Sequence, residues 1–195
     1  MTRSTRKSKE TDAKFEICIL AGGLSSRMGR DKATIRIGKT TLLGIIKAMA
    51  KKTGWPVRVI RRDLVERCGP LGGVYTALKS TRAEAVLFLA CDMPFVTAEL
   101  LQKLISRFGT RTNALFIETE EGAGFPFILP TAELVQIEQQ LSRKRFSLQA
   151  LAEAMKARTL RPLKRERPTL LNINTAADWK RAEDSFREHA KKHSA

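Results

Sequence analysis

The sequence predicts an α/β fold in which a mostly parallel sheet is covered by helices on both faces. Two observations predict it. Short apolar runs alternate with amphipathic helix patterns along the chain. Two of these runs, Phe15–Leu20 and Ala85–Ala90, have the unbroken apolar character of strands buried on both faces. The 195 residues, 43% of them hydrophobic, suffice for one domain, which we expect at 15–190 between a basic disordered arm at 1–14 and a short tail at 191–195.

Each expected strand is a short apolar or alternating segment that ends at a turn. A pair of glycines closes the first run, and Thr34–Ile37 alternates polar and apolar side chains before a further glycine. The run that ends at Ala90 stops at Cys91 and Asp92. The expected strands are, in chain order, 15–20, 34–37, 57–60, 85–90, 114–117 and 127–129.

Each expected helix carries apolar residues at helical spacing, so that they form one buried face. In one of them Thr97 precedes Glu99, the pattern of an N-cap with an acid in the first turn. The expected helices are, in chain order, 40–52, 72–80, 97–108, 131–141, 147–156 and 176–189.

The chain is strongly basic, with 36 Lys and Arg against 20 Asp and Glu and a formal charge of +16. Much of the excess lies outside the expected core, in the first 14 residues, in Arg143–Arg167 and after Lys180. This charge indicates an anionic partner. We expect no nucleic acid, because a single Tyr and two Trp leave the basic stretches without interleaved aromatic side chains. The longest uncharged apolar run, Ala85–Cys91, is far shorter than the roughly 18 residues that span a bilayer, so we expect no membrane association and a cytoplasmic location.

The segment Leu20–Lys32 (LAGGLSSRMGRDK) is the first candidate site. Its glycines follow the first strand, at the sheet edge where α/β folds bind ligands, and they allow backbone N–H groups to approach a ligand closely. Arg27, Arg30 and Lys32 then provide cations suited to a polyphosphate. The alternative is a surface turn with solvated charges.

Asp92 is the second candidate, since it follows a buried strand and emerges at the same edge as the glycine loop. One carboxylate together with substrate phosphates is a usual way of holding Mg²⁺. The alternative is that Asp92 only begins a turn before Pro94. Nearby, Gly38-Lys39-Thr40 resembles the end of a phosphate-binding Walker loop, but the half-polar Thr34–Ile37 cannot be the buried strand that such a loop follows.

Five segments together resemble the molybdenum cofactor guanylyltransferase family of MobA-like nucleotidyltransferases. Their order and approximate spacing agree over about residues 15–185. They are LAGGLSSRMGRDK (20–32), GPLGG (69–73) with Asp63 six residues ahead, LACDMP (89–94), GFPF (124–127) and NINT (172–175) with Asp178 after it.

The resemblance implies a Rossmann-like three-layer αβα sandwich of the nucleotide-diphospho-sugar transferase type. It implies Mg²⁺-dependent transfer of GMP from GTP to the phosphate of molybdopterin, and it suggests molybdoenzymes or cofactor-delivery proteins as partners. The residues that it assigns to the nucleotide are Leu20, Ala21, Gly22, Gly23, Lys32, Asp63 and Asp92. The residues that it assigns to catalysis are Arg27, Lys32 and Asp92, with Asp92 as the metal ligand. The residues that it assigns to the acceptor are Asn172 and Asn174.

The chain departs from the family between Lys52 and Asp63, where only ten residues remain. Relatives carry a further strand there, and an Asn that helps to hold the base has no counterpart in this sequence. Three alternatives therefore remain: a transferase that uses CTP, a transferase with a different phosphorylated acceptor, and a non-catalytic protein that binds an anion or a cofactor.

Overall fold

The computed structural model describes residues 15–22, 36–37, 40–65, 67–109 and 113–192. Its centre is a six-stranded sheet in the order β4-β1-β5-β7-β6-β8, in which β7 alone runs antiparallel to its neighbours. The strands are β1 (Phe15–Leu20), β4 (Val57–Ile60), β5 (Ala85–Ala90), β6 (Leu115–Thr119), β7 (Gly122–Pro130) and β8 (Arg158–Leu160). The predicted α/β class with a mostly parallel sheet is confirmed.

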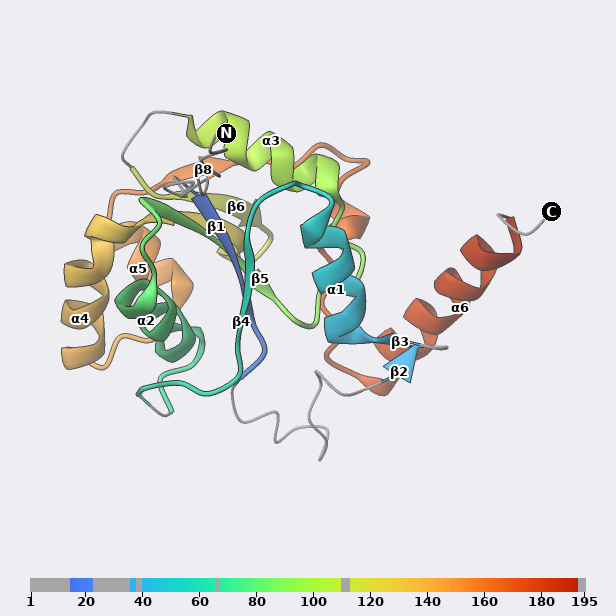
Figure 1. The fold of residues 1–195 in the computed structure, drawn as a ribbon, viewed down its shortest axis with the longest axis horizontal. Coiled ribbons are helices and arrows are strands. Elements are labelled where there is room, and N and C mark those ends of the chain that lie inside the picture. Colours follow the sequence, from blue (N-terminus) through green and yellow to red (C-terminus); the bar gives the residue numbers. More distant parts are fainter. Residues whose placement is uncertain (1–14, 23–35, 38–39, 66, 110–112, 193–195) are drawn as a thin grey trace, which may run out of the picture.

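Helices cover both faces of this sheet and make a three-layer molecule (Figure 1). On one face lie α1 (Leu42–Lys51) and α3 (Ala98–Phe108). On the other face lie α2 (Pro70–Ser80), α4 (Leu134–Ser142) and α5 (Leu148–Ala154). The central strands are therefore buried on both sides, which explains their apolar sequences.

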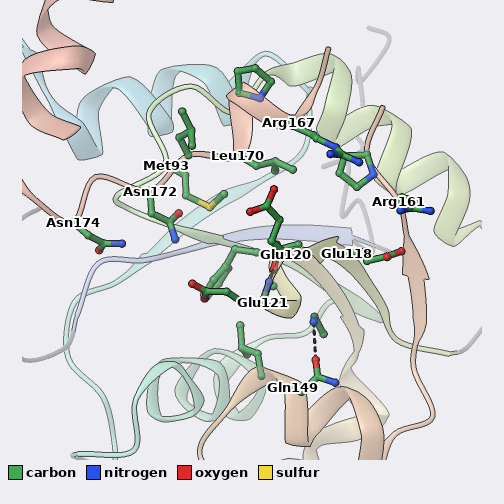
Figure 2. A pocket seen from close by; sticks show the side chains of 18 of the residues that line it. Met93, Glu118, Glu120, Glu121, Gln149, Arg161, Arg167, Leu170, Asn172 and Asn174 are labelled. Carbon is green, nitrogen blue, oxygen red and sulfur yellow. Dashed lines mark hydrogen bonds between the residues drawn. The ribbon is translucent and has the colours of Figure 1, made fainter. Parts of the chain in front are cut away.

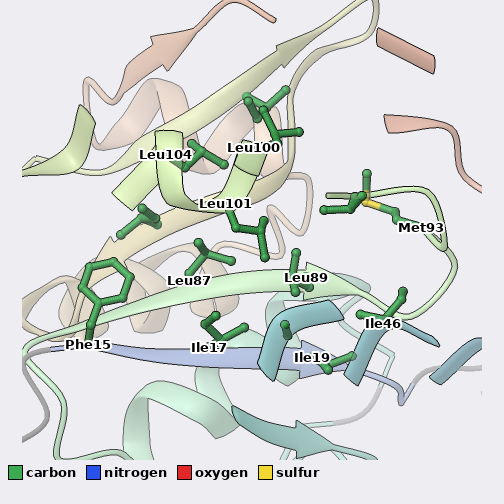
Figure 3. Packing of buried hydrophobic residues seen from close by; sticks show 14 of the residues in the cluster. Phe15, Ile17, Ile19, Ile46, Leu87, Leu89, Met93, Leu100, Leu101 and Leu104 are labelled. Atoms are coloured by element: carbon green, nitrogen blue, oxygen red, sulfur yellow. The ribbon is translucent and has the colours of Figure 1, made fainter. Parts of the chain in front are cut away.

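Alternation along the strands divides the core between the two helical layers. Ile17 and Ile19 of β1 pack with Leu101 and Leu104 of α3, as Figure 3 shows, whereas Cys18 points to the opposite cluster. All five side chains are fully buried. Each buried Leu or Ile contributes roughly 1.5–3 kcal/mol, so the two clusters together fix the layers around the sheet.

Side-chain caps set the beginnings of three helices. Thr41 Oγ1 accepts from the N–H of Gly44 (3.0 Å) at α1, and Ser147 caps α5 in the same way. Thr97 Oγ1 accepts from the N–H of Leu100 (3.3 Å), which confirms the predicted cap of α3. Such caps satisfy amide groups that the first helical turn leaves open.

Several elements differ from the sequence-based expectations. The helix expected at 40–52 begins at Leu42, because Thr40–Thr41 forms β3, which pairs antiparallel with β2 (Arg36–Ile37). The strand expected at 127–129 is the nine-residue β7. Strand β8 was not expected, because its three residues lie within the basic stretch that we placed outside the core; it joins the sheet through backbone pairing with β6, which needs no apolar side chains. The helix expected at 131–141 is divided into the 3₁₀ helix η2 (Thr131–Glu133) and α4, and the 3₁₀ helix η3 (Arg167–Leu170) was missed.

The last helix, α6 (Ala176–Lys192), extends away from the three layers (Figure 1). A small third cluster anchors its first half, with Ala182 fully buried and Phe186 stacked on Phe95 at a ring-centroid distance of 5.4 Å. No helix within the described residues has the length and apolar character needed to cross a membrane.

Arg58 of β4 joins three elements and generates a stability prediction. Its guanidinium donates to Glu16 of β1 (2.6 Å), to Ser80 Oγ (2.6 Å) and to the carbonyl oxygen of Ala77 in α2 (2.8 Å). We expect Arg58→Met to lower the free energy of unfolding by about 1–2 kcal/mol, because a largely buried Glu16 loses its cation. Chemical denaturation measures this change.

Arg82→Met is the matched control, since Arg82 is exposed and the substitution removes the same charge. The expected change is within about 0.5 kcal/mol. Equal losses for the two variants would contradict the role given to Arg58.

Candidate functional site

The parallel strands β4, β1 and β5 end at one edge of the sheet, where two backbone hydrogen bonds continue the pairing beyond the strands. The N–H of Ala21 donates to the carbonyl oxygen of Ile60 (2.8 Å), and the N–H of Cys91 donates to the carbonyl oxygen of Leu20 (3.1 Å). The three predicted residues that follow these strands therefore meet at this edge. They are Gly22, Asp63 and Asp92.

Asp63 lies between the loop after β1 and the first turn of α2. A Cβ atom at Gly22 would lie 3.2 Å from Asp63 Oδ1 and 2.9 Å from the carbonyl oxygen of Arg61. A Cβ atom at Gly72 would lie 2.9 Å from Asp63 Oδ2 and 2.5 Å from the carbonyl oxygen of Val65. These approaches leave no room for a side chain, so the two glycines are required for the loops to close around the carboxylate.

The segment after Asp63 is tied to α2. The N–H of Leu64 donates to Thr76 Oγ1 (2.8 Å), and that hydroxyl donates to the carbonyl oxygen of Gly72 (2.7 Å). Burial raises the pKa of Asp63 above its ordinary value. The carboxylate is thus held in a confined position that disfavours its charged form.

Asp92 lies against the segment that the sequence assigned to the acceptor. Its backbone carbonyl oxygen accepts from the N–H of Ile173 (2.8 Å), and the flanking residues are Asn172 and Asn174. The Oδ1 atom of Asp92 is shielded from solvent. Asp92 and Ile173, which are 81 positions apart in sequence, are thus joined at one point of the edge.

The turn at 172–175 is fixed by the acid that follows it. One carboxylate oxygen of Asp178 accepts from the N–H groups of Asn174 (3.2 Å) and Thr175 (2.9 Å) and from the hydroxyl of Thr175 (2.8 Å). These hydrogen bonds, that of the Thr175 hydroxyl first, hold the pKa of Asp178 below its ordinary value. The capped turn places Asn172 and Asn174 at the cleft described next.

A cleft of about 1050 Å³ opens beside this turn. Figure 2 shows Asn172, Asn174 and Met93 on one side of it and Arg161 and Arg167 on the other. Its floor is the tip of the β6–β7 hairpin, which carries Glu118, Glu120 and Glu121. The side-chain oxygen of Gln149 in α5 accepts from the N–H of Ala123 (2.7 Å) and so holds the hairpin.

The structure brings together every predicted site residue that it describes. Leu20 ends β1 and Ala21 and Gly22 follow it, Asp63 packs against Gly22, and Asp92 lies beside Asn172 and Asn174. The remaining predicted residues, Gly23, Arg27 and Lys32, lie outside the described residues. Within the described part of the chain, no group of three His, Cys, Asp or Glu side chains could hold a metal ion.

The floor and the far wall of the cleft were not predicted from the sequence. The hairpin acids gave no signal because the strand expected at 127–129 was too short to reveal a hairpin. The arginines gave none because β8 was not recognised. The missed residues are Glu118, Glu120, Glu121, Gln149, Arg161 and Arg167.

The fold is that of the nucleotidyltransferases. A crystal structure of molybdopterin-guanine dinucleotide biosynthesis protein A from Archaeoglobus fulgidus superimposes with a TM-score of 0.73 at 19% identity, covering 89% of this chain and 99% of that one. 2-C-methyl-D-erythritol 4-phosphate cytidylyltransferase from Thermus thermophilus gives a TM-score of 0.64 at 17% identity over 88% and 98% of the two chains. A Mycobacterium tuberculosis protein solved in complex with manganese gives 0.58 at 20% identity over 88% and 98%.

The sequence belongs to the MobA-like NTP transferase family, whose domain it matches over residues 17–62 and 47–160. A probable molybdenum cofactor guanylyltransferase from Opitutus terrae is 30% identical over 195 aligned positions, which span 89% of this chain and 94% of that protein. One of the same name from Flavobacterium johnsoniae is 35% identical over 124 positions, which span 56% of this chain and 64% of that protein. The predicted family and enzyme class are confirmed.

The raised pKa of Asp63 generates a pH-dependent prediction. Consider a carboxyl group whose pKa is higher in the folded state than in the unfolded state. Its contribution to stability is fully present at pH values below the unfolded-state pKa, and it is lost as the pH rises through the folded-state pKa. At pH values above the raised pKa of Asp63, we therefore expect Asp63→Asn to raise the melting temperature. At pH values well below the ordinary pKa of 3.8, we expect the substitution to have little effect.

Thermal melts of both proteins across this pH range test the prediction. Asp184→Asn, at an exposed carboxylate on α6, is the control and should leave the pH profile unchanged. A destabilised Asp63→Asn protein at neutral pH would show that the charged carboxylate stabilises the fold.

Proposed function

We propose that this protein transfers GMP from GTP to the phosphate of molybdopterin, giving molybdopterin guanine dinucleotide and pyrophosphate. Membership of the MobA-like NTP transferase family supports nucleotidyl transfer, and the names of the Opitutus and Flavobacterium relatives support this donor and acceptor. The single observation that carries the proposal is the contact of Asp92 with the 172–174 turn, because it joins the end of a nucleotide-binding sheet to the mouth of the cleft.

The donor half of the proposed site is the edge formed by β1 and β4. Leu20, Ala21 and Gly22 provide a backbone surface for the nucleoside, and Asp63 beside Gly22 accepts hydrogen bonds from the base or the ribose. Gly23, Arg27 and Lys32 are assigned to the nucleotide and its phosphates by their motif, since they lie outside the described residues. The acceptor half is the cleft, with Asn172 and Asn174 at its entrance.

The residues present suit a divalent cation, and we propose Mg²⁺. Asp92 offers one carboxylate at the sheet edge, and Mg²⁺ is commonly held by one or two carboxylates with substrate phosphates and water as the other ligands. The manganese complex of the Mycobacterium protein, which shares this fold, agrees with a divalent cation. When bound, the cation neutralises charge on the triphosphate and orients it.

The reaction needs little acid–base chemistry from the chain. An oxygen of the acceptor phosphate attacks the α-phosphorus of GTP, the bond to the β-phosphate breaks, and pyrophosphate leaves with the bonding electrons. An ionised phosphate is already a nucleophile, so the chain positions the two substrates and neutralises their charge. Arg27 and Lys32 are proposed to stabilise the charge that develops on the departing pyrophosphate.

Donor binding provides the first test. We expect the purified protein to bind GTP more tightly than CTP, ATP or UTP at fixed moderate salt, and Mg²⁺ to tighten that binding. Equilibrium titration of the four nucleotides with and without Mg²⁺ measures it. Tighter binding of CTP would reassign the donor, and weak binding of all four that salt removes would overturn the proposal.

Asp92→Asn provides the second test. We expect turnover to fall by a factor of about 10²–10³ or more, because the carboxylate that holds the cation is lost, while the melting temperature changes little. Product formation from GTP and molybdopterin measures turnover. Asp184→Asn removes a distant carboxylate and should keep full activity. Normal turnover of Asp92→Asn would refute the metal assignment.

A further inference from the structure

The segment from β8 to η3 forms the far wall of the cleft, and its geometry is set by Glu166. One carboxylate oxygen of Glu166 accepts from the N–H of Leu163 (2.8 Å). In return, the carbonyl oxygen of Leu163 accepts from the N–H groups of Glu166 (2.9 Å) and Arg167 (3.2 Å). The hydroxyl of Thr169 donates to the carbonyl oxygen of Glu166 (2.6 Å) and so closes the turn. The wall therefore folds around one side chain.

Lys103 of α3 anchors that side chain to the body of the protein. Its Nζ atom donates to both carboxylate oxygens of Glu166, at 2.8 and 2.7 Å. The two side chains are only 25% and 17% exposed, and the helix beneath them is fixed by the buried Leu101 and Leu104. Burial alone would raise the pKa of Glu166, but the hydrogen bonds from Lys103 and Leu163 outweigh it and hold that pKa below the ordinary value.

The wall presents two exposed arginines to the cleft, Arg161 and Arg167. Among the residues that the structure describes, no ion pair engages either guanidinium. By contrast, Lys164 and Arg165 lie on the same segment and do not line the cleft. Of the cations between 161 and 167, these two arginines face the ligand space.

The sheet order separates these arginines from the reacting centre. Arg161 follows β8, which lies three strands from β5 and Asp92, and neighbouring strands are about 4.8 Å apart, so the separation across the sheet is about 14 Å. Figure 2 shows Asn172 and Asn174 across the cleft from Arg161 and Arg167. A phosphate that reacts beside Asp92 and a group held at the far wall therefore lie at opposite ends of the cleft.

We propose that the cleft has a second anion position, in which Arg161 and Arg167 bind an anionic group of the acceptor other than its reacting phosphate, and that the Lys103–Glu166 pair positions them. This inference rests on the proposed function, in which the acceptor carries an anionic dithiolene group in addition to its phosphate. A guanidinium group is always charged and is more weakly hydrated than an ammonium group, so it suits the binding of such an anion. Arg161 and Arg167 thus select acceptors with two anionic groups.

Two probes separate the two anion positions. Molybdopterin carries the phosphate and the dithiolene, whereas hydroxymethylpterin phosphate carries the phosphate alone. Pterin fluorescence reports equilibrium binding of both to the full chain. We expect Arg161→Met with Arg167→Met to weaken molybdopterin binding by about tenfold or more and to leave hydroxymethylpterin phosphate within about twofold, because only the second position is removed.

Variants of the pair test positioning. Lys103→Met and Glu166→Gln should show the same selective loss, with KM for molybdopterin raised and kcat at saturation retained, and Lys103→Arg should restore binding because it keeps the ion pair. Lys79→Met is the matched control, since Lys79 forms an exposed ion pair with Glu138 (3.6 Å) away from the cleft. Lys164→Ala controls for the loss of one charge from the same wall.

Each outcome decides the inference. Equal losses of affinity for both probes would mean that the arginines hold the reacting phosphate, which overturns the inference. Equal affinity of the wild-type protein for molybdopterin and hydroxymethylpterin phosphate would mean that there is no second anion position, which also overturns it. Guanylyl transfer with normal KM in the arginine variants would overturn it and leave the proposed function standing. Selective binding without guanylyl transfer would support the second position and refute the proposed function.

Discussion

The parallel pairing of β1 with both β4 and β5 is the constraint on which the site depends. The register pairs Leu20 with Ile60 on one side and with Ala90 on the other, so all three strands end level. Whatever follows them in sequence must therefore meet in space. The buried alternation of Ile17, Cys18 and Ile19 fixes this register, because a slip by one residue would exchange the two faces of β1 between the helical layers.

Charge is arranged across the proposed acceptor site rather than spread evenly over it. The 172–174 turn is neutral, the hairpin tip carries three glutamates, and the far wall carries two arginines. The basic excess of the chain thus does not fill the cleft. Among the described residues that line the cleft, the cations lie at one end and the carboxylates along the floor, which favours a single orientation of the acceptor over random capture of anions. Net charge alone predicts an anionic ligand but not this polarity.

The sequence predicted the fold class and the position of Gly22 and Asp92 at one edge of the sheet, because both follow from local patterns. Apolar runs identify β1 and β5, and the residues that close those runs, Gly22 and Asp92, lie where the rule for open sheets places them. It could not predict β8, because three residues in a basic stretch carry no periodic signal and pair through the backbone. The floor and the far wall of the cleft were therefore missed, although their polar residues are as plain in the sequence as Asp92. The closeness of Asp92 and Ile173 likewise depends on tertiary packing that no local pattern encodes.

The reversed direction of β7 brings the β6–β7 turn to the same edge as the ends of the parallel strands. The tip of this hairpin is held by its own two strands and by the Gln149 side chain of α5, so residues can be added or exchanged there without moving β1, β4 or β5. The loops proposed to bind the donor and the floor of the cleft are therefore mechanically separate parts of the molecule. In such an architecture, a lineage of transferases can acquire a new acceptor while the machinery for the nucleotide stays as it was.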